Sequence, residues 1–265
     1  MDLLSEMKAR GIDKLTQLKG FRVSGAACPN HVVEDLLDHG ILPQKGYGMT
    51  ETNSHQYTRP NDPRNLIVET SGQCCDGYEL RIWDQDDADV EMPPGEIGQV
   101  GGKGACLMLG YFDDQTNTEN ALNADGWFMT GDLGTIDGNG FLRITGRKKE
   151  LIIRGGHNIN PNVIEELALR HDAVERVAAI PVPHDRLGEQ VCLAVMTKPG
   201  ADVAPEDMLE HLAAEGLSKY DMPEFWLALD DIPLMPNGKV QKIEITRRVR
   251  SGEETPDPVR RRENA

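Results

Sequence analysis

The stretch that decides the fold lies at residues 126–164 and reads GWFMTGDLGTIDGNGFLRITGRKKELIIRGGHNINPNVI. It contains a carboxylate at Asp132, a tight-turn signal, DGNG, at residues 137–140, and a cationic run at residues 147–149. A buried-strand pattern, a glycine pair and a capped helix start follow directly. So many different features that can contact a ligand are unusual in a short segment of a domain that binds none. We therefore interpret the stretch as a ligand-handling joint between two structural units.

The chain before this joint is predicted to mix helices with strands and to contain an antiparallel β-subdomain. DGNG favours a hairpin between TGDLGTI and FLRIT, because Asp-Gly and Asn-Gly adopt the positive φ angles of tight turns. The run at residues 101–104, GGKG, lacks the upstream glycine and the following Ser/Thr of a phosphate loop, so a turn is expected. The other expected elements are helices at 2–10, from Pro29 to Gly40 and at 113–122, and strands at 21–23, 79–83 and 96–100.

The chain after the joint follows a pattern that predicts a separate α+β unit of about a hundred residues. Asn160 is a good helix N-cap and Pro161 a good first helical residue. Residues 250–265 carry little apolar content and are predicted to be a disordered tail. We place the boundary at Lys148-Lys149, which gives units at 1–148 and 149–249. The expected elements are strands at 151–153, 174–181, 191–197 and 225–229, and a helix at 205–215.

The composition excludes several classes of protein. A net charge of −16 argues against nucleic-acid binding, which needs a basic face, although the cationic segment 147–154 can still bind one phosphate ester. No apolar run has the length of a membrane span, and the amino terminus lacks a signal-peptide pattern, so we predict a cytoplasmic protein. Five cysteines without CxxC spacing favour reduced thiols, and no His/Cys cluster has zinc spacing.

A second segment with candidate ligand groups, QKGYGMTETN, lies at residues 44–53. Tyr47 stands between two glycines, Gly46 and Gly48, and Thr50 is followed by Glu51. Taken alone, the segment favours a glycine-bearing strand end. The functional alternative is an aromatic ring for stacking, a hydroxyl for a phosphate and a carboxylate for a phosphate-bound Mg²⁺.

Five blocks then match a known family in order. They are GYGMTET (46–52), PPGEIGQVGGKGACLMLGYF (93–112), GWFMTGDLGTID (126–137), GRKKELIIRGGHNINPNVIEE (146–166) and PLMPNGKVQK (233–242). Smaller echoes, LGEQVCLAVM (187–196) and LSKYDMPE (217–224), lie between them. From about residue 19 to residue 242 the chain resembles the carboxyl-terminal half of the AMP-forming acyl-CoA synthetases, members of the adenylate-forming ligases.

The resemblance implies a mixed α+β fold. Residues 1–148 would be the end of the large AMP-binding (adenylation) domain, with part of an α/β subdomain and an antiparallel, barrel-like β-subdomain. Residues 149–249 would be the small, mobile carboxyl-terminal domain. The implied activity is that of an acid–thiol ligase: a carboxylic acid, fatty or alicyclic, attacks MgATP to form an acyl-adenylate and pyrophosphate, and CoA then displaces AMP.

Site residues follow from the same resemblance, position by position. The implied catalytic residues are Lys239, the lysine of adenylation, Thr50, which would hold a phosphate oxygen, and Glu51, which would bind Mg²⁺. A point cation suits the charge that develops as carboxylate and phosphate meet. The residues implied for ATP, AMP or CoA are Gly25, Ala26 and Ala27 in the adenine and acyl pocket, Tyr47 on adenine between Gly46 and Gly48, Asp132 and Arg147 at the ribose, Lys149 as the hinge, and Gly155 and Gly156 along the pantetheine channel.

One departure from the family pattern concerns the Ser/Thr/Gly-rich phosphate loop, which nothing in residues 1–45 matches. We therefore expect a fragment that lacks this loop, is impaired as an adenylating enzyme when alone, and associates with a missing amino-terminal half or with a second copy. The expected partners are the acid, ATP and CoA, without nucleic acid or a transmembrane segment. Alternatives are a ligase that acylates a carrier-protein thiol and a non-catalytic nucleotide-binding or interaction fragment.

Overall fold

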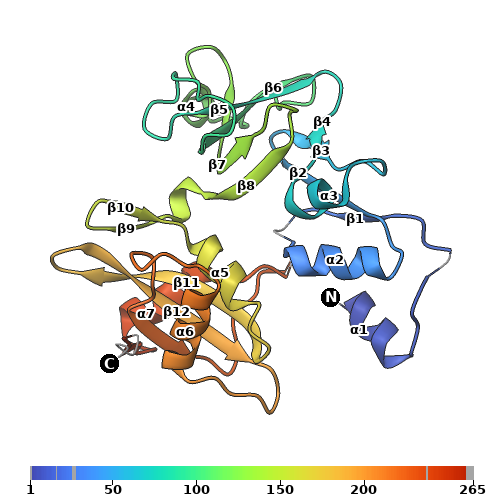
Figure 1. Ribbon diagram of the computed structural model, residues 1–265. Helices are drawn as coiled ribbons and strands as arrows, with labels where there is room; N and C mark the ends of the chain where they lie inside the picture. Colours follow the sequence, from blue (N-terminus) through green and yellow to red (C-terminus); the bar gives the residue numbers. More distant parts are fainter. Residues whose placement is uncertain (1, 16, 26–27, 237, 261–265) are drawn as a thin grey trace. The chain divides into compact units, whose positions relative to one another are not determined.

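The computed structural model describes residues 2–15, 17–25, 28–236 and 238–260. It divides the chain into two compact units, Met1–Lys148 and Lys149–Ala265 (Figure 1). The division falls where the sequence analysis places the boundary. Each unit has hydrophobic clusters of its own. The mixed α+β fold class expected from the sequence is confirmed.

The first part of unit 1 is a small sheet with helices packed beside it. Its strand order is β1-β2-β3-β4, with β1 and β2 parallel and the other neighbours antiparallel. Helices α2 and α3 pack together around Val33, Ile67 and Val68, which are buried. The elements are α1 (Asp2–Ala9), β1 (Phe21–Val23), α2 (Asn30–Asp38), β2 (Pro43–Met49), β3 (Asn53–Tyr57), α3 (Arg64–Glu69) and β4 (Gln73–Cys74).

The second part of unit 1 is the expected antiparallel β-subdomain, with strand order β5-β6-β7-β8. The predicted hairpin is confirmed: the N–H of Gly140 donates to the carbonyl of Asp137 at 3.0 Å, between β7 and β8. Asp114 caps the expected helix by accepting the N–H of Asn117. The elements are β5 (Tyr78–Trp83), β6 (Gly98–Gly104), α4 (Gln115–Asn120), β7 (Phe128–Ile136) and β8 (Leu142–Arg147).

The predicted turn at residues 101–104 is wrong, because this segment is the second half of strand β6. A Cβ on Gly101 would lie 2.3 Å from Nε1 of Trp83, and one on Gly102 would lie 2.3 Å from the hydroxyl of Tyr78. Both aromatic side chains are buried. The glycines are therefore needed so that two rings of β5 can cover β6, and they do not mark a change of chain direction.

Unit 2 is organised around the long antiparallel pair β11 and β12, with β13 parallel to β12. Its strand order is β10-β9-β12-β13-β14, with β11 on the other side of β12. Asn160 caps α5 and Pro161 is its first residue, as predicted. The elements are the 3₁₀ turn η1 (Lys148–Glu150), β9 (Ile152–Arg154), β10 (His157–Ile159), α5 (Pro161–Ala168), β11 (Val174–His184), β12 (Gly188–Thr197), α6 (Pro205–Ala214), β13 (Phe225–Ala228), α7 (Lys242–Ser251) and β14 (Asp257–Pro258).

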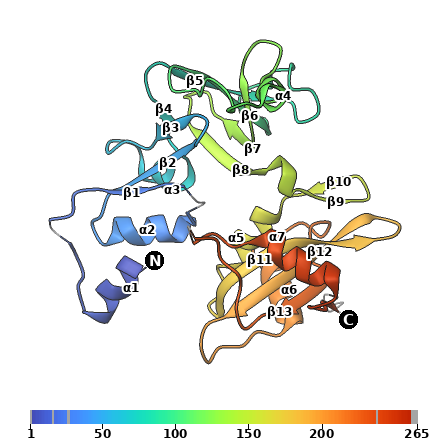
Figure 2. The same ribbon diagram turned by 180° about the vertical axis from the view of Figure 1, so that it is seen from behind.

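Both faces of this sheet are covered. Alternate residues of a strand point to opposite faces, so Val177 and Ala179 join one hydrophobic cluster while Ala178 and Ile180 join the other. Helices α5 and α6 contribute to the first cluster, and α7 contributes Ile245 to the second. Figure 2, seen from behind, shows α7 lying across the sheet.

The prediction of a disordered tail is wrong for residues 250–260. The N–H of Val259 donates to the carbonyl of Glu224 at 2.9 Å, β14 pairs with β13, and the Val259 side chain is buried. The segment is held by the buried side chain of Val259 and by the pairing of β14 with β13. A prediction from average composition misses it, because a single buried apolar residue hardly changes that average. The helix α7, which the sequence analysis did not anticipate, precedes it. Residues 261–265 lie outside the described residues.

In the part of the chain that the structure describes, every helix is too short or too polar to cross a membrane.

Candidate functional site

Three of the candidate residues meet in one hydrogen-bonded cluster of unit 1. Strands β7 and β8 pair so that Asp132 lies opposite Arg147, and Nε of Arg147 forms an ion pair with Oδ1 of Asp132 at 2.8 Å. The hydroxyl of Tyr47 donates to Oδ2 of the same carboxylate at 2.7 Å. Asp132 is only 4% exposed. A buried carboxylate needs such partners, because an unpaired charge is costly to remove from water.

The surroundings of this carboxylate fix its position. The N–H of Asp132 donates to the hydroxyl of Thr130, which in turn donates to the carbonyl of Val100 at 2.8 Å. Burial, and then the charge of Asp132, raise the pKa of Tyr47, so its hydroxyl stays protonated and remains a donor. A carboxylate has about four acceptor sites. Asp132 can therefore accept two further hydroxyl groups, such as those of a ribose, without losing Tyr47 or Arg147.

The glycines beside Tyr47 allow β2 and β3 to approach closely. A Cβ on Gly48 would lie 2.1 Å from the carbonyl oxygen of Asn53, and one on Gly46 would lie 3.1 Å from that of Gln56. The strand-end interpretation and the site interpretation of this segment are thus compatible. Gly25 follows β1 with a φ of +85°. Ala26 and Ala27, also candidates for the adenine and acyl pocket, lie outside the described residues.

Thr50 and Glu51 lie on the turn between β2 and β3. The carbonyl of Glu51 accepts the N–H of Met108 at 2.7 Å, and its Oε1 accepts the hydroxyl of Tyr111 at 3.1 Å. Thr50 is exposed. One carboxylate together with phosphate oxygens is an ordinary ligand set for Mg²⁺. Glu51, which is held in place and has a second oxygen that can bind, fits that role.

Sequence reasoning missed three side chains that contact the candidate residues: Thr130 beside Asp132, Tyr111 on Glu51 and His55 beside Tyr47. Thr130 and Tyr111 lie within the sequence blocks that match the family. The residues next to them in those blocks do not indicate which side chains they contact. His55 is completely buried, stacks on Tyr78 with ring centroids 4.0 Å apart, and meets the ring of Tyr47 edge-on at 5.7 Å. No sequence signal identifies His55. The sequence does not indicate whether a strand residue two positions after a turn points to the core or to solvent.

His55 packs against the ring of Tyr47 as a buried, uncharged imidazole. Among the described residues, neither of its ring nitrogens has a hydrogen-bond partner. Burial lowers the pKa of His55 to about 4, because a charged imidazolium would be desolvated there. At neutral pH the ring is therefore uncharged and packs between the rings of Tyr47 and Tyr78.

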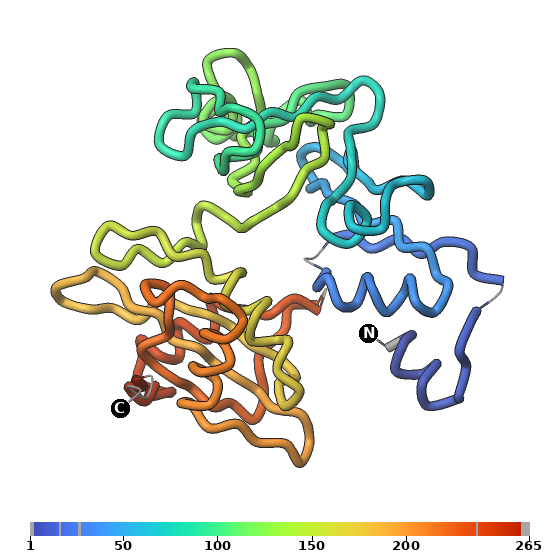
Figure 3. The backbone as a smooth tube through the Cα atoms, in the orientation of Figure 1, coloured from blue at the N-terminus to red at the C-terminus, as the bar shows by residue number. Residues whose placement is uncertain are grey.

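The remaining candidates belong to unit 2. Strands β9 and β10 form a narrow hairpin, the yellow-green loop of the backbone in Figure 3. Gly155 and Gly156 form its two-residue turn, with φ values of +60° and +88°. Two successive positive φ angles favour glycine strongly, so the turn alone explains the pair. Lys149 lies in the 3₁₀ turn η1 at the start of the unit.

Lys239 lies on a short hairpin that leads into α7. Leu234 pairs with Val240 in an antiparallel bridge, and the N–H of Met235 donates to the carbonyl of Lys239 at 2.7 Å. The side chain of Lys239 is half-buried. The hairpin therefore presents this lysine on a defined backbone and not on a loose chain end.

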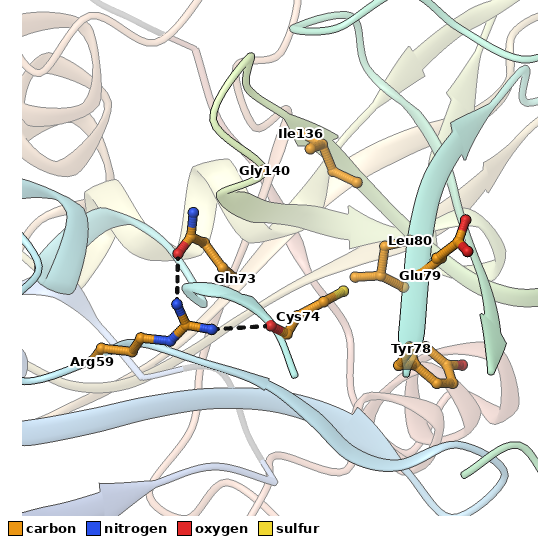
Figure 4. A pocket seen from close by; sticks show the side chains of 8 residues that line it. All are labelled: Arg59, Gln73, Cys74, Tyr78, Glu79, Leu80, Ile136 and Gly140. Carbon is orange, nitrogen blue, oxygen red and sulfur yellow. Dashed lines mark hydrogen bonds between the residues drawn. The ribbon is translucent and has the colours of Figure 1, made fainter. Parts of the chain in front are cut away.

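A separate hollow of about 390 Å³ lies in unit 1 (Figure 4). In it, Arg59 donates to Oε1 of Gln73 at 3.2 Å and to the carbonyl of Cys74 at 3.3 Å. None of the predicted site residues lines this hollow. The residues that line it are Arg59, Gln73, Cys74, Tyr78, Glu79, Leu80, Ile136 and Gly140.

Two family descriptions match separate parts of the chain. Residues 1–112 match the family described as AMP-binding enzyme, and residues 163–239 match the AMP-binding enzyme C-terminal domain. The first match lies in unit 1 and the second in unit 2. The chain belongs to the AMP-binding enzymes, the family of the AMP-forming acyl-CoA synthetases, which confirms the resemblance found in the sequence.

Individual relatives agree with this assignment. The chain is 32% identical over 243 residues to the medium-chain fatty-acid–CoA ligase of Escherichia coli (strain K12), a match covering 91% of this chain and 42% of that ligase. It is 36% identical over 232 residues to an octahydro-indenyl-propanoyl:CoA ligase of Rhodococcus jostii (strain RHA1), covering 86% of this chain and 42% of the relative.

Among solved structures, ATP-bound MatB from Rhodopseudomonas palustris superimposes with a TM-score of 0.82 at 29% identity, covering 94% of this chain and 53% of that one. The chain therefore spans 42% of these two curated relatives and about half of the solved structure.

Proposed function

We propose that this chain provides the ribose-binding site and the mobile domain of an ATP-dependent carboxylic acid–CoA ligase. The reaction is acid plus ATP plus CoA giving acyl-CoA, AMP and pyrophosphate through an acyl-adenylate. The observation that supports it best is the cluster of Tyr47, Asp132 and Arg147, because a buried carboxylate with spare acceptor sites suits the two hydroxyls of a ribose.

In the first half-reaction, Tyr47 stacks on adenine and Asp132 accepts the ribose hydroxyls, in a pocket that Gly25, Gly46 and Gly48 help to line. Thr50 holds a phosphate oxygen, and Glu51 holds Mg²⁺, which neutralises phosphate charge when bound. Lys239 stabilises the negative charge that forms as the carboxylate approaches the α-phosphate. Each of these roles suits the chemistry of its side chain, and Tyr47 and Asp132 are already in contact.

In the second half-reaction, the CoA thiol attacks the acyl carbon of the adenylate and AMP leaves. Gly155 and Gly156 line the pantetheine channel, where a side chain would narrow the passage. Lys149 is the hinge between the half-reactions, since it begins unit 2 at the division of the chain.

The acid is proposed to be a fatty or alicyclic carboxylic acid. The Escherichia coli relative is named for medium-chain fatty acids and the Rhodococcus jostii relative for an octahydro-indenyl propanoate. Because the chain spans only 42% of these relatives, we further propose that full activity requires a polypeptide corresponding to the rest of their length. Free CoA, not a carrier-protein thiol, is the proposed acceptor, because these relatives are named as CoA ligases.

The test separates nucleotide binding from the two half-reactions. Calorimetric titration of the purified chain with AMP should show binding that Asp132→Asn weakens. Pyrophosphate release is then measured with a panel of acids, and thioester formation is measured from a synthetic acyl-adenylate and CoA. AMP binding without either half-reaction in the isolated chain is expected of a fragment, so both assays are repeated with a polypeptide corresponding to the rest of the relatives' length. Turnover in that mixture supports the ligase, and AMP binding with no turnover there favours the non-catalytic nucleotide-binding alternative. No AMP binding at all would overturn the proposal.

A further inference from the structure

Lys242, the first residue of α7, is surrounded by oxygen atoms of unit 2. Its Nζ lies 2.8 Å from Oε1 of Glu165 and 3.3 Å from Oε2 of Glu150. A third oxygen, Oδ1 of Asn162, lies 3.4 Å away. The lysine thus joins three segments that are distant in sequence: the turn η1, the start of α5 and the start of α7.

Glu165 is the fixed member of this group. Its side chain is 15% exposed, and its Oε1 also accepts the N–H of Ala179 in β11 at 2.7 Å. Burial raises the pKa of the Glu165 carboxyl, and the charge of Lys242 opposes that shift. A carboxylate that is desolvated to this extent depends on its cation, so the pair is held together firmly.

The hairpin that carries Lys239 ends directly at this junction. The N–H of Gln241 donates to the carbonyl of Pro233 at 2.8 Å, so the two ends of the hairpin are tied immediately before Lys242. Leu234 and Met235, on the hairpin, are 40% and 43% exposed, so neither anchors it as a core residue would. The anchor of Lys242 therefore sets where the hairpin leaves the unit.

Glu150 extends the junction toward the proposed hinge. It is the last residue of η1 and directly follows Lys149. Its side chain is 38% exposed, so its pair with Lys242 contributes little to stability by itself. The contribution of Glu150 is to position the turn. It connects the turn that contains Lys149 to the ammonium group of Lys242, which also anchors the hairpin that carries Lys239.

We propose that Lys242 is a positioning residue that acts through Glu165 and Glu150, and that it holds the Lys239 hairpin in a fixed relation to the turn of Lys149. This inference rests on the proposed function of Lys239 in adenylation. Loss of Lys242 should therefore impair acyl-adenylate formation and spare thioester formation, which uses a different face of the same unit.

The kinetic experiment compares Lys242→Met and Lys242→Arg with Lys198→Met, a lysine of the same unit whose Nζ contacts only the carbonyl of Asp172 among its described partners. With the chain combined with a polypeptide corresponding to the rest of its relatives' length, Lys242→Met should slow acid-dependent pyrophosphate release about 10- to 100-fold, the loss expected from a small misplacement of a reacting group. Thioester formation from synthetic acyl-adenylate and CoA should stay near the unmodified rate, and Lys242→Arg should retain both. Equal losses in both half-reactions would overturn the inference.

A second measurement does not depend on turnover. In Lys242→Met, hydrogen exchange at the Met235 and Gln241 amides should rise about tenfold, which corresponds to about 1.4 kcal/mol of local opening free energy. Exchange in β11 and β12 should rise only as far as the lower stability of the unit requires, and by less than at these two amides. The double variant Glu165→Gln with Lys242→Met, which leaves no buried unpaired charge, should recover thermal stability but keep the fast hairpin exchange. Recovery of both would show a purely structural ion pair and overturn the proposal.

Lys239→Ala separates the two proposals. If this variant adenylates normally, the proposed role of Lys239 fails. If Lys239→Ala abolishes adenylation while Lys242→Met has no effect on adenylation or on hairpin exchange, only the positioning role of Lys242 fails.

Discussion

Asp132 owes its position to residues far from it in the sequence. Its two carboxylate oxygens are shared between Arg147, opposite it on β8, and Tyr47, which is 85 positions earlier in the chain. The family blocks identified all three as candidates, but none of the three blocks indicated that they touch. A residue whose partners lie on two other strands can be singled out by pattern, while its contacts with them depend on how those strands are arranged in the fold.

Asp132→Asn should lower AMP affinity by about tenfold or more, because a neutral amide accepts fewer hydrogen bonds and loses the charge that pairs with Arg147. Calorimetric titration with AMP measures the change. Asp125→Asn, an exposed aspartate of the same unit, is the matched control and should bind AMP normally. Equal affinity for the Asp132 variant and this control would refute the ribose role.

His55 should make unit 1 sensitive to acid. The folded pKa is about 4 and the ordinary value is 6.5, so between these values the unfolded chain binds a proton that the folded chain does not. Stability should be unaffected by this group above about pH 7 and should fall by about 2 kcal/mol by about pH 5. Urea unfolding at the two pH values, with His55→Phe for comparison, measures the difference. A parallel loss in both proteins would mean that His55 does not carry it.

At the scale of single elements, the sequence was informative where a local rule applies. The hairpin at residues 137–140, the N-cap Asn160 and the strands of unit 2 follow from turn chemistry, capping and periodicity, all of which operate over a few residues. The predictions for the glycine run at 101–104 and for the segment after residue 250 were wrong because no local rule decides the conformation there. Their conformation is set by Trp83 and Tyr78 on a neighbouring strand, and by the core that receives Val259.

Gly101→Ala should destabilise unit 1 by about 1–3 kcal/mol, the usual cost of overpacking, because the new methyl group would collide with the buried Trp83. Gly138→Ala is the matched control, since nothing lies within 4 Å of a Cβ at that position of the hairpin turn. Denaturant unfolding of both variants tests this account of β6. A neutral Gly101→Ala would indicate that Trp83 can move aside at no cost.

At the scale of the whole molecule, the chain is two compact units with separate cores. The family assignment agrees with this organisation, because one family description matches residues 1–112 and the other matches residues 163–239. The proposed reaction needs both units: the ribose cluster belongs to unit 1, and Lys239 belongs to unit 2.

The two units should respond separately to core mutations. Leu212→Ala removes a fully buried side chain from the core of unit 2 and should destabilise that unit by about 2–5 kcal/mol. Hydrogen exchange should accelerate in β11 and β12 and remain unchanged in β6 and β7. Faster exchange in both units would show that they unfold as one cooperative block.

The sequence by itself determined the family, the boundary region and most of the local elements, because motifs, caps and turns depend on neighbouring residues. It also selected the candidate residues, through block order and residue chemistry. Only the tertiary structure decided which of them touch: Tyr47 with Asp132, Trp83 over Gly101, Val259 in the core, and Lys242 between Glu165 and Glu150. These contacts join residues far apart in the chain, and strand register and packing, which no local pattern encodes, bring them together.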